Sequence, residues 1–219
     1  MRLIAIGDIH GCASTLERLL SDLQLQQGDH LVFLGDYIDR GPDSAGVIEQ
    51  MLRLRKAPSL TCTFIRGNHD QMMLDYLDTG EMELWQHNGG IETLKSYRQG
   101  TDVVIPPEHI DFLRSTVMFF DSDNYFFVHA GARPDQSVAW NVEHGSASVF
   151  LWSREHLHTS ATEWEKTVVC GHTPIPHPIL RPDLIAIDTG CVFAGRTGLG
   201  LLTAIDLPSR ALTQTPYVG

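Results

Sequence analysis

Polar side chains that can bind a metal ion or transfer a proton follow five short apolar stretches of this sequence. The central stretch is Gly35-Asp36-Tyr37-Ile38-Asp39-Arg40-Gly41, which comes directly after the apolar run His30–Leu34. Because open α/β sheets place their ligands at the carboxyl ends of strands, we expect its two carboxylates and its guanidinium at such an edge. The other stretches carry the same kind of chemistry: Gly7-Asp8-Ile9-His10-Gly11, Gly67-Asn68-His69-Asp70, His129-Ala130-Gly131 and Gly171-His172-Thr173.

The donor atoms in these stretches are carboxylates, an amide and imidazoles, with no thiolate at a comparable position. Such a set suits Mn, Fe or Zn better than Mg or Ca alone. Six ligands exceed one transition-metal site if water must also bind, but they fit two ions about 3.5–4 Å apart. Asp36 leads the central loop, so we expect it to bridge the ions beside a hydroxide that attacks phosphate in line. The six expected metal ligands are Asp8, His10, Asp36, Asn68, His129 and His172.

The remaining polar residues predict how a phosphate ester would be held and cleaved. His69 is the expected general acid for the leaving-group oxygen, and Asp39 would orient and charge its imidazole. Arg40 offers a planar fork for phosphate oxygens, and Asn68 is expected to contact phosphate as well as metal. Arg154, in Leu151-Trp152-Ser153-Arg154, is a second candidate clamp or else part of a surface turn.

Any one of these motifs could be an ordinary turn with a structural histidine. Five of them, each after an apolar run, predict a site, and no Ser/His/Asp or Cys/His arrangement offers a protein nucleophile. The other histidines lack this context and are expected to be solvated or structural.

Length and composition indicate one globular domain over residues 1–219, with 42% hydrophobic and 20% charged residues. The formal net charge of −11 argues against nucleic acid polymers and anionic membranes as partners. It leaves an anionic substrate open, because bound cations can invert the local field. We expect a cytoplasmic protein, since the chain shows no transmembrane run, no signal peptide and four well-separated cysteines expected to be thiols.

The order of apolar segments predicts parallel βαβ units followed by an insertion. Strands are expected at Arg2–Ile6, at 30–34 and at 60–65. The first helix is expected to begin at a capping box formed by Ser14 and Glu17. A mostly helical insert at about 71–115 would lie beside the site, as a lid, a substrate-selecting wall or a plain structural cap.

The second half of the chain predicts a hairpin at 117–128, a loop-rich passage at 132–166 and a buried strand at 167–170. Strands at 184–187, 199–205 and 211–215 are expected to close a second sheet. The simplest architecture is α/β: a β-sandwich of two mixed sheets flanked by helices.

The motifs GDIHG, GDYIDRG, GNHD, HAG and GHT together resemble the bacterial and phage-type phosphoprotein phosphatases of the calcineurin-like metallophosphoesterase superfamily. The resemblance runs from about Met1 to Leu207. It implies a central β-sandwich and a dinuclear site, often supplied with Mn²⁺ in bacterial members. It also implies roles for the residues: Asp8, His10 and Asp36 on the first metal; Asp36, Asn68, His129 and His172 on the second; His69 with Asp39 as the acid pair; and Arg40, with Arg154 by a looser match, on phosphate.

Some positions depart from the eukaryotic protein phosphatases of this family. The third motif ends in Asp70 rather than Glu, and the fourth is HAG rather than HGG. The tail Ile187-Asp188-Thr189-Gly190-Cys191 resembles bacterial members that include diadenosine tetraphosphate hydrolases. The symmetrically cleaving hydrolases, however, typically carry alanine at the position of Asp39, so the intact Asp39-Arg40 pair favours a phosphomonoesterase.

We therefore predict a metal-dependent serine/threonine protein phosphatase, with phosphotyrosine as a further substrate. Its cofactors would be two divalent transition-metal ions, Mn²⁺ first, with Fe or Zn as alternatives. The alternative function is hydrolysis of dinucleoside polyphosphates such as diadenosine tetraphosphate. A remote alternative is a non-catalytic regulator that binds metal and phosphorylated partners. The substrate is then a phosphoprotein or a phosphorylated small molecule.

Overall fold

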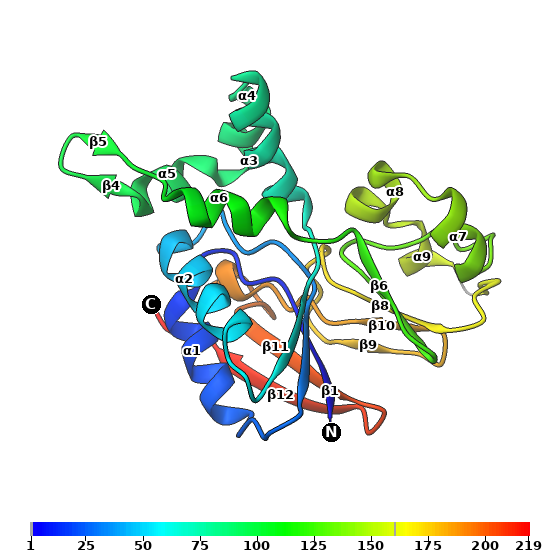
Figure 1. Ribbon diagram of the computed structural model, residues 1–219. Helices are drawn as coiled ribbons and strands as arrows, with labels where there is room; N and C mark the ends of the chain where they lie inside the picture. The colour runs from blue at the N-terminus through cyan, green and yellow to red at the C-terminus, as the bar shows by residue number, and fades with distance from the viewer. Residues whose placement is uncertain (1, 160) are drawn as a thin grey trace.

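Two five-stranded sheets stack face to face, and helices cover the outer face of each sheet (Figure 1). The computed structural model describes residues 2–159 and 161–219. The expected sandwich of two mixed sheets with flanking helices is confirmed. The carboxyl ends of the first strands lie at the end of the sandwich from which the helical insert and a second group of helices project (Figure 1).

The first sheet has the strand order β12-β11-β1-β2-β3. Its β1, β2 and β3 pair in parallel, as βαβ connections require, whereas β11 is antiparallel to both β1 and β12. The expectation that the last two strands close the second sheet is therefore wrong, because β11 pairs with the first strand of the chain. The strands are β1 (Leu3–Ile6), β2 (His30–Phe33), β3 (Thr61–Phe64), β11 (Leu201–Leu207) and β12 (Ala211–Pro216).

The second sheet has the order β6-β7-β8-β10-β9. Its inner strands β7, β8 and β10 are parallel, and β6 and β9 are antiparallel edges. The predicted hairpin is thus present as β6 and β7. The strands are β6 (Phe119–Asp121), β7 (Tyr125–Val128), β8 (Thr167–Cys170), β9 (Ile179–Leu180) and β10 (Leu184–Ala186).

The strands that precede the site are continuous apolar runs, because their side chains point alternately to two faces of the sheet and both faces are buried. In β2, Leu31 and Phe33 pack toward the helices that cover the first sheet, whereas Val32 packs between the two sheets. Both faces of the strand are buried, so neither set of alternating positions can be polar. Val169 and Ile185 of the second sheet meet Val32 in the same central core.

Two helices cover the first sheet, α1 (Ala13–Asp22) and α2 (Ser44–Arg55). The predicted capping box is wrong: α1 begins two residues earlier than expected, with Cys12 rather than Ser14 as N-cap and no side-chain cap. Gly11 turns the chain with a φ of 63°, so the helix starts immediately and Ser14 lies exposed in its first turn. At α2, by contrast, the side chain of Asp43 accepts the N–H of Gly46 as an N-cap.

The insert is mostly helical, as expected, but its first helix starts earlier than the hydrophobic pattern indicates. Helix α3 (Asn68–Thr79) takes the whole Asn68-His69-Asp70 sequence into its first turn. The other elements are α4 (Glu83–Trp85), a π-helical turn (Gln86–Gly90), α5 (Ile91–Ser96), the hairpin β4 (Arg98–Gln99) and β5 (Asp102–Val103), and α6 (Pro107–Arg114).

The passage at 132–166 contains three short helices, so the loop-rich expectation is wrong there; Ser160 within it lies outside the described residues. Helices of four to seven residues are too short to show a hydrophobic period. For two of these helices, the signal in the sequence is a capping serine at the N-terminus, Ser137 or Ser146. The helices are α7 (Val138–His144), α8 (Ala147–Trp152) and α9 (Glu155–His158).

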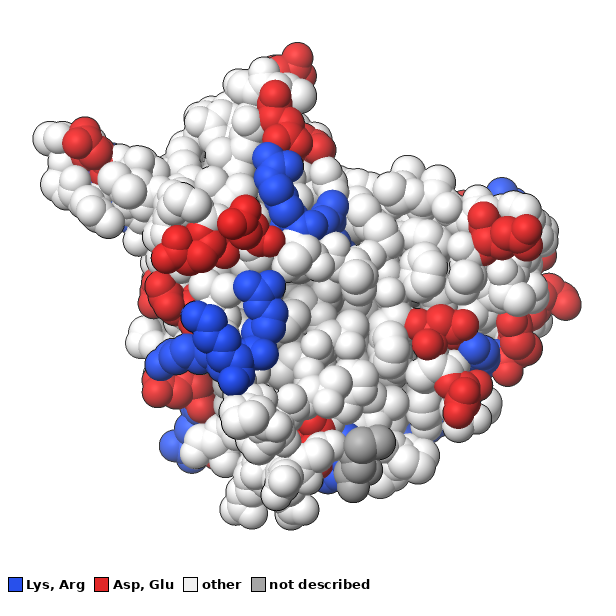
Figure 2. Space-filling view, viewed as in Figure 1, with Lys and Arg blue, Asp and Glu red and all other residues white. Residues whose placement is uncertain are grey.

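The surface carries charges of both signs (Figure 2), and the four cysteines, which all lie in the described residues, form no disulfide. Acidic and basic side chains are interspersed on the face shown in Figure 2, without a continuous basic surface. Among residues 2–159 and 161–219, no helix is long and apolar enough to cross a membrane. All four cysteines are free.

Candidate metal centre

The segments that follow β1, β2, β3, β7 and β8 converge at one end of the sandwich. Backbone hydrogen bonds join them: the N–H groups of Ile9 and His10 donate to the carbonyl of Asp36 at 3.1 and 2.8 Å. Gly171 donates in the same way to the carbonyl of His129 at 2.8 Å. All the predicted site residues except Arg154 meet in this region, where the six expected ligands are at most 7% exposed.

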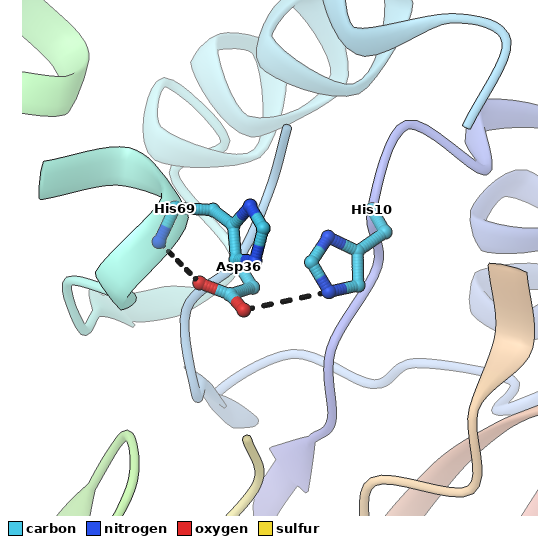
Figure 3. Close-up of side chains that lie close together, drawn as sticks. All are labelled: His10, Asp36 and His69. Carbon is cyan, nitrogen blue, oxygen red and sulfur yellow. Dashed lines mark hydrogen bonds and ion pairs between the residues drawn. The ribbon is translucent and has the colours of Figure 1, made fainter. Parts of the chain in front are cut away.

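Asp36 lies between two histidines that come from different sheets. Its Oδ2 is 3.4 Å from Nε2 of His10, and its Oδ1 is 3.5 Å from Nε2 of His129. Oδ1 also accepts the backbone N–H of His69 at 3.0 Å, as Figure 3 shows. Each oxygen therefore faces a different imidazole, which is the arrangement that a bridging carboxylate needs.

Backbone carbonyls fix the tautomers of two histidines. Nδ1–H of His10 donates to the carbonyl of Ile38 at 2.9 Å, and Nδ1–H of His129 donates to that of Leu34 at 2.8 Å. In both residues Nε2 keeps its lone pair, and both Nε2 atoms point at Asp36. A second interaction of this kind is what orients metal-bound histidines.

Further acceptor atoms converge beside His129. Oδ1 of Asn68 lies 2.9 Å from Nε2 of His129 and 2.9 Å from Nδ1 of His172. Nε2 of His172 is buried and has no hydrogen-bond partner in the described part of the chain. A cation that bound Oδ1 of Asn68 and Nε2 of His129 would therefore meet Nδ1 of His172, because that ring nitrogen faces the same oxygen.

Burial sets the protonation of the histidines. It lowers the pKa of His10 and His129, and lowers the pKa of His172 to about 2. At neutral pH these imidazoles are uncharged, which is the form that binds a metal ion.

Burial also shifts the pKa values of the carboxyl groups at the site. Burial raises the pKa of Asp8 well above its usual range, and the nearby carboxylates of Asp188 and Asp36 raise it further. Burial also raises the pKa of Asp188 to about 7. For Asp36 burial opposes ionisation, but the surrounding histidines lower its pKa below the ordinary value. Buried acidic groups with few neighbouring cations fit a centre that binds divalent metal ions.

These residues form two close groups of donors that share Asp36. One contains His10, Asp36 and His69, the other Asp36, His129 and His172; within each group the donor atoms lie within 4.8 Å of one another. Asp8 belongs to neither group. Both of its oxygens accept the backbone N–H of His172, at 3.1 and 3.0 Å, so it links the first and last motifs of the site.

His69 is paired with a buried carboxylate. Its Nδ1 lies 2.7 Å from Oδ2 of Asp39, which leaves Nε2 as the nitrogen free to act on a ligand. The ring of His69 packs edge-on against the ring of His10, with 4.7 Å between centroids. The same nitrogen could serve either as a metal ligand or as a proton donor, so the acid role stays a prediction.

The two arginines occupy different positions. Half-buried Arg40 places its Nη1 2.6 Å from Nε2 of His10. Exposed Arg154 lies outside the ligand cluster, in the wall of a cavity of about 390 Å³ that also contains Trp152. The ring of Trp152 packs edge-on against His172, with 5.9 Å between centroids. Arg154 is therefore at the rim of the site, on the side of His172.

Backbone strain is concentrated at the site. In the described residues, seven residues other than glycine have a positive φ, and five of them are predicted site residues. Left-handed backbone is unfavourable for such residues and tends to persist where the surrounding structure enforces it. The five are His10 (46°), Asp36 (51°), Asp39 (72°), Arg40 (67°) and His172 (67°).

Asp70 shapes the central loop, a role that the sequence motifs did not predict. Its Oδ2 accepts the N–H groups of Asp36 and Gly67 at 2.9 and 2.8 Å, and its Oδ1 accepts that of Tyr37 at 3.1 Å. The signal was available, because an acidic residue at the third helical position can accept from the N-cap backbone. Buried Asp188, which neighbours Asp8, was noted only as part of the tail motif.

A sandwich of two mixed sheets with a buried cluster of His, Asp and Asn donors defines the class of metal-dependent hydrolases that act on phosphate esters. The family model of the calcineurin-like phosphoesterases matches residues 1–195. The chain therefore belongs to the calcineurin-like phosphoesterase family, whose members use a dinuclear metal site.

Individual relatives carry two kinds of activity in their names. The chain is 32% identical to serine/threonine-protein phosphatase 1 of Salmonella typhimurium, over 89% of this chain and 88% of the relative. It is 27% identical to the asymmetrical bis(5'-nucleosyl)-tetraphosphatase PrpE of Halalkalibacterium halodurans, over 99% and 94% of the two chains.

Solved structures repeat this division. A crystal structure described only as a candidate diadenosine tetraphosphatase superposes with a TM-score of 0.72 at 25% identity, covering 100% of this chain and 94% of the other. The cold-active protein-tyrosine phosphatase of a Shewanella species superposes with a TM-score of 0.67 at 19% identity, covering 99% and 78%, which supports the fold alone.

Proposed function

We propose that this protein is a metal-dependent phosphomonoesterase that removes phosphate from serine and threonine side chains of proteins. The observation that carries the proposal is the buried pair of His69 and Asp39, whose Nδ1 and Oδ2 lie 2.7 Å apart beside the donor groups. The relative at 32% identity, a serine/threonine-protein phosphatase, supports the same assignment.

The chemistry of the leaving group explains why the pair favours monoesters of alcohols. A serine or threonine alkoxide is a poor leaving group, so its departure benefits strongly from a positioned general acid. A nucleotide phosphate is a far better leaving group and needs little help from a proton donor. A buried pair of this kind is therefore more useful to a phosphomonoesterase than to a polyphosphate hydrolase.

The donor residues fit two divalent cations, with Asp36 between them, His10 and Asp8 on one side, and Asn68, His129 and His172 on the other. When bound, such ions would offset the charge of the phosphoryl oxygens and activate water; Mn²⁺ is our first candidate, with Fe or Zn as alternatives. The second donor group supports this assignment, as does the approach of Nε2 of His129 and Nδ1 of His172 to one oxygen, Oδ1 of Asn68.

The side chains around the ions would hold the ester and supply the proton. The guanidinium of Arg40 would bind phosphoryl oxygens from the His10 side, and Arg154 from the rim beside His172. Nε2 of His69 would hold a proton toward the leaving-group oxygen while Nδ1–H stays bonded to Asp39. Asn68, which lies beside the second donor group, is the further predicted contact to phosphate.

The direct test is release of inorganic phosphate from a phosphoserine or phosphothreonine peptide by Mn²⁺-loaded protein. We expect turnover that stops when a chelator removes the metal. Asp39→Asn should lose most of this activity, whereas Asp43→Asn, the same change at an exposed helix cap four residues away, should keep it. A protein with two bound ions that releases no phosphate from the peptide would refute the proposal.

Hydrolysis of dinucleoside polyphosphates is the second candidate. It is favoured by the similarity to the asymmetrical tetraphosphatase over 99% of this chain and by the superposition at a TM-score of 0.72. The test is incubation of a high enzyme concentration with diadenosine tetraphosphate. AMP with ATP would indicate asymmetrical cleavage and two ADP symmetrical cleavage, and the absence of every nucleotide product would remove this candidate.

A further inference from the structure

Asp39 is held by two uncharged side chains from the helical insert, and we propose that these residues, Trp85 and Thr93, are positioning residues for the proton transfer to the leaving group. Helix α4 ends at Trp85, and Thr93 lies in α5. The inference rests on the proposed function, because it assigns the insert a part in the same reaction.

The hydrogen bonds around Asp39 leave neither oxygen free to turn. The indole Nε1–H of Trp85 donates to both oxygens, at 2.9 Å to Oδ1 and 3.0 Å to Oδ2. The hydroxyl of Thr93 donates to Oδ1 at 2.7 Å. Oδ2 lies 2.7 Å from Nδ1 of His69, so one oxygen serves the histidine while the insert fixes the other.

Thr93 also holds the backbone of the same residue. Its Oγ1 accepts the N–H of Asp39 at 2.9 Å and lies 3.0 Å from the hydroxyl of Ser44. Asp39 has a φ of 72°, a conformation that local sequence does not favour and that these contacts maintain. Thr93 thus contacts both the main chain and the carboxylate of Asp39, and the hydroxyl of Ser44 also accepts the N–H of Asp39, at 3.2 Å.

Two glycines let the insert come this close. At Gly89 a Cβ atom would lie 2.8 Å from Cγ of Arg40, and the carbonyl of Gly89 accepts the N–H of Arg40 at 3.2 Å. At Gly90 a Cβ atom would lie 2.6 Å from the ring of Trp85. The π-helical turn therefore packs directly on the loop of the acid pair, which a detached wall or lid would not do.

The hydrogen bonds to Asp39 lie where solvent cannot replace them. Asp39, His69, Trp85 and Thr93 are each at most 1% exposed, so water cannot replace a lost hydrogen bond. Burial by itself raises the pKa of Asp39, and the hydrogen bonds from His69, Thr93 and Trp85 oppose that rise. Removing a donor would leave a buried carboxylate less well oriented toward the histidine.

The test compares two substrates that differ in their need for an acid. Trp85→Phe keeps an aromatic ring and removes the N–H, and Thr93→Val keeps the shape and removes the hydroxyl. For each Mn²⁺-loaded variant, kcat would be measured with a phosphoserine peptide and with p-nitrophenyl phosphate, whose leaving group departs without a proton. We expect roughly a tenfold loss on the peptide and little change on the aryl ester.

Matched controls separate positioning from general damage. Trp164→Phe removes an indole N–H that donates to the carbonyl of Arg133 at 2.9 Å, far along the chain from the acid pair. It should alter the two substrates equally. Thr93→Ser, which restores the hydroxyl, should recover the peptide activity that Thr93→Val loses. In an Asp39→Asn background, Trp85→Phe should cause no further loss on the peptide.

The outcomes distinguish this inference from the proposed function. If the wild type hydrolyses no phosphomonoester, the proposed function fails whatever the variants do. If the wild type hydrolyses the peptide but Trp85→Phe and Thr93→Val lower both substrates equally, as Trp164→Phe does, the positioning role is refuted. Unequal losses that disappear in the Asp39→Asn background establish it.

Discussion

The carboxylate of Asp39 and the imidazole of His69 form a buried pair, with 2.7 Å between Oδ2 and Nδ1 and both side chains at most 2% exposed. His69 belongs to the donor group of His10 and Asp36, whereas the Asp39 carboxylate does not. A substitution at Asp39 can therefore test the acid pair without removing a member of either donor group.

Asp39→Asn and His69→Asn should lower kcat on a phosphoserine peptide by roughly 100- to 10,000-fold, because each removes the general acid or its orientation. Metal content, measured by mass spectrometry of the purified protein, should remain near the wild-type value for Asp39→Asn. Unchanged turnover with intact metal content would show that the pair does not donate the proton.

Asp36→Ala should remove both metal ions, because its oxygens face His10 and His129 in different donor groups. His172→Ala should lose only one, since it belongs to the second group alone. The measurement is the number of Mn²⁺ ions per chain after equilibrium dialysis, with Asp111→Ala on the exposed face of α6 as control. Loss of a single ion from Asp36→Ala would contradict the bridging position.

Asp70→Ala should destabilise the fold by roughly 3 kcal/mol or more, because the buried N–H groups of Asp36, Tyr37 and Gly67 would all lose the acceptor that they share. Urea unfolding of metal-free protein would give the free energy of unfolding. Asp75→Ala, an exposed change on the same helix, should stay within about 0.5 kcal/mol of the wild type. Equal values for the two variants would refute the structural part assigned to Asp70.

His156 should make the fold sensitive to acid. Burial lowers its pKa to about 4, below the ordinary value of 6.5, so the unfolded chain binds more protons between these values. The free energy of unfolding should therefore fall as pH drops from 6.5 to 4, by roughly 3 kcal/mol from this residue, and its contribution should be complete above 6.5. Nδ1 of His156 has no hydrogen-bond partner in the described part of the chain, which suits a residue kept neutral by burial.

The measurement for His156 is urea unfolding of metal-free wild type and His156→Gln at several pH values. Because other histidines titrate equally in both proteins, only the difference between the curves reports on His156. The wild-type curve should fall more steeply below pH 6.5. Parallel curves would show that His156 does not titrate in this window.

The donors of the site could be predicted from sequence because they follow strands whose two faces are both buried. The run at 30–34 is apolar at every position but its first, and its end places Asp36 without knowledge of the pairing partners. Such local rules do not identify partners far apart in the chain. Strand β11 pairs with β1, with Ile6 opposite Ala204, and nothing in either segment indicates that register.

The residues that position the acid pair were harder to predict from the sequence than the donors themselves. Trp85 and Thr93 carry no charge, and they reach Asp39 only because the chain turns through Gly89 and Gly90. Asn88-Gly89-Gly90 could be identified as a turn signal, but its target depends on the tertiary fold. Helices as short as α9 give too few turns for a hydrophobic period to emerge.

The most direct test of the proposed function is kcat/KM of the Mn²⁺-loaded protein on a phosphothreonine peptide and on diadenosine tetraphosphate, measured in parallel, because this ratio reports discrimination between competing substrates. We predict a preference for the peptide of more than about tenfold, since only the alcohol leaving group needs the proton that His69 and Asp39 are placed to give. A comparable preference for the dinucleotide would contradict the phosphoprotein assignment. It would show that the intact acid pair does not set the substrate of this enzyme.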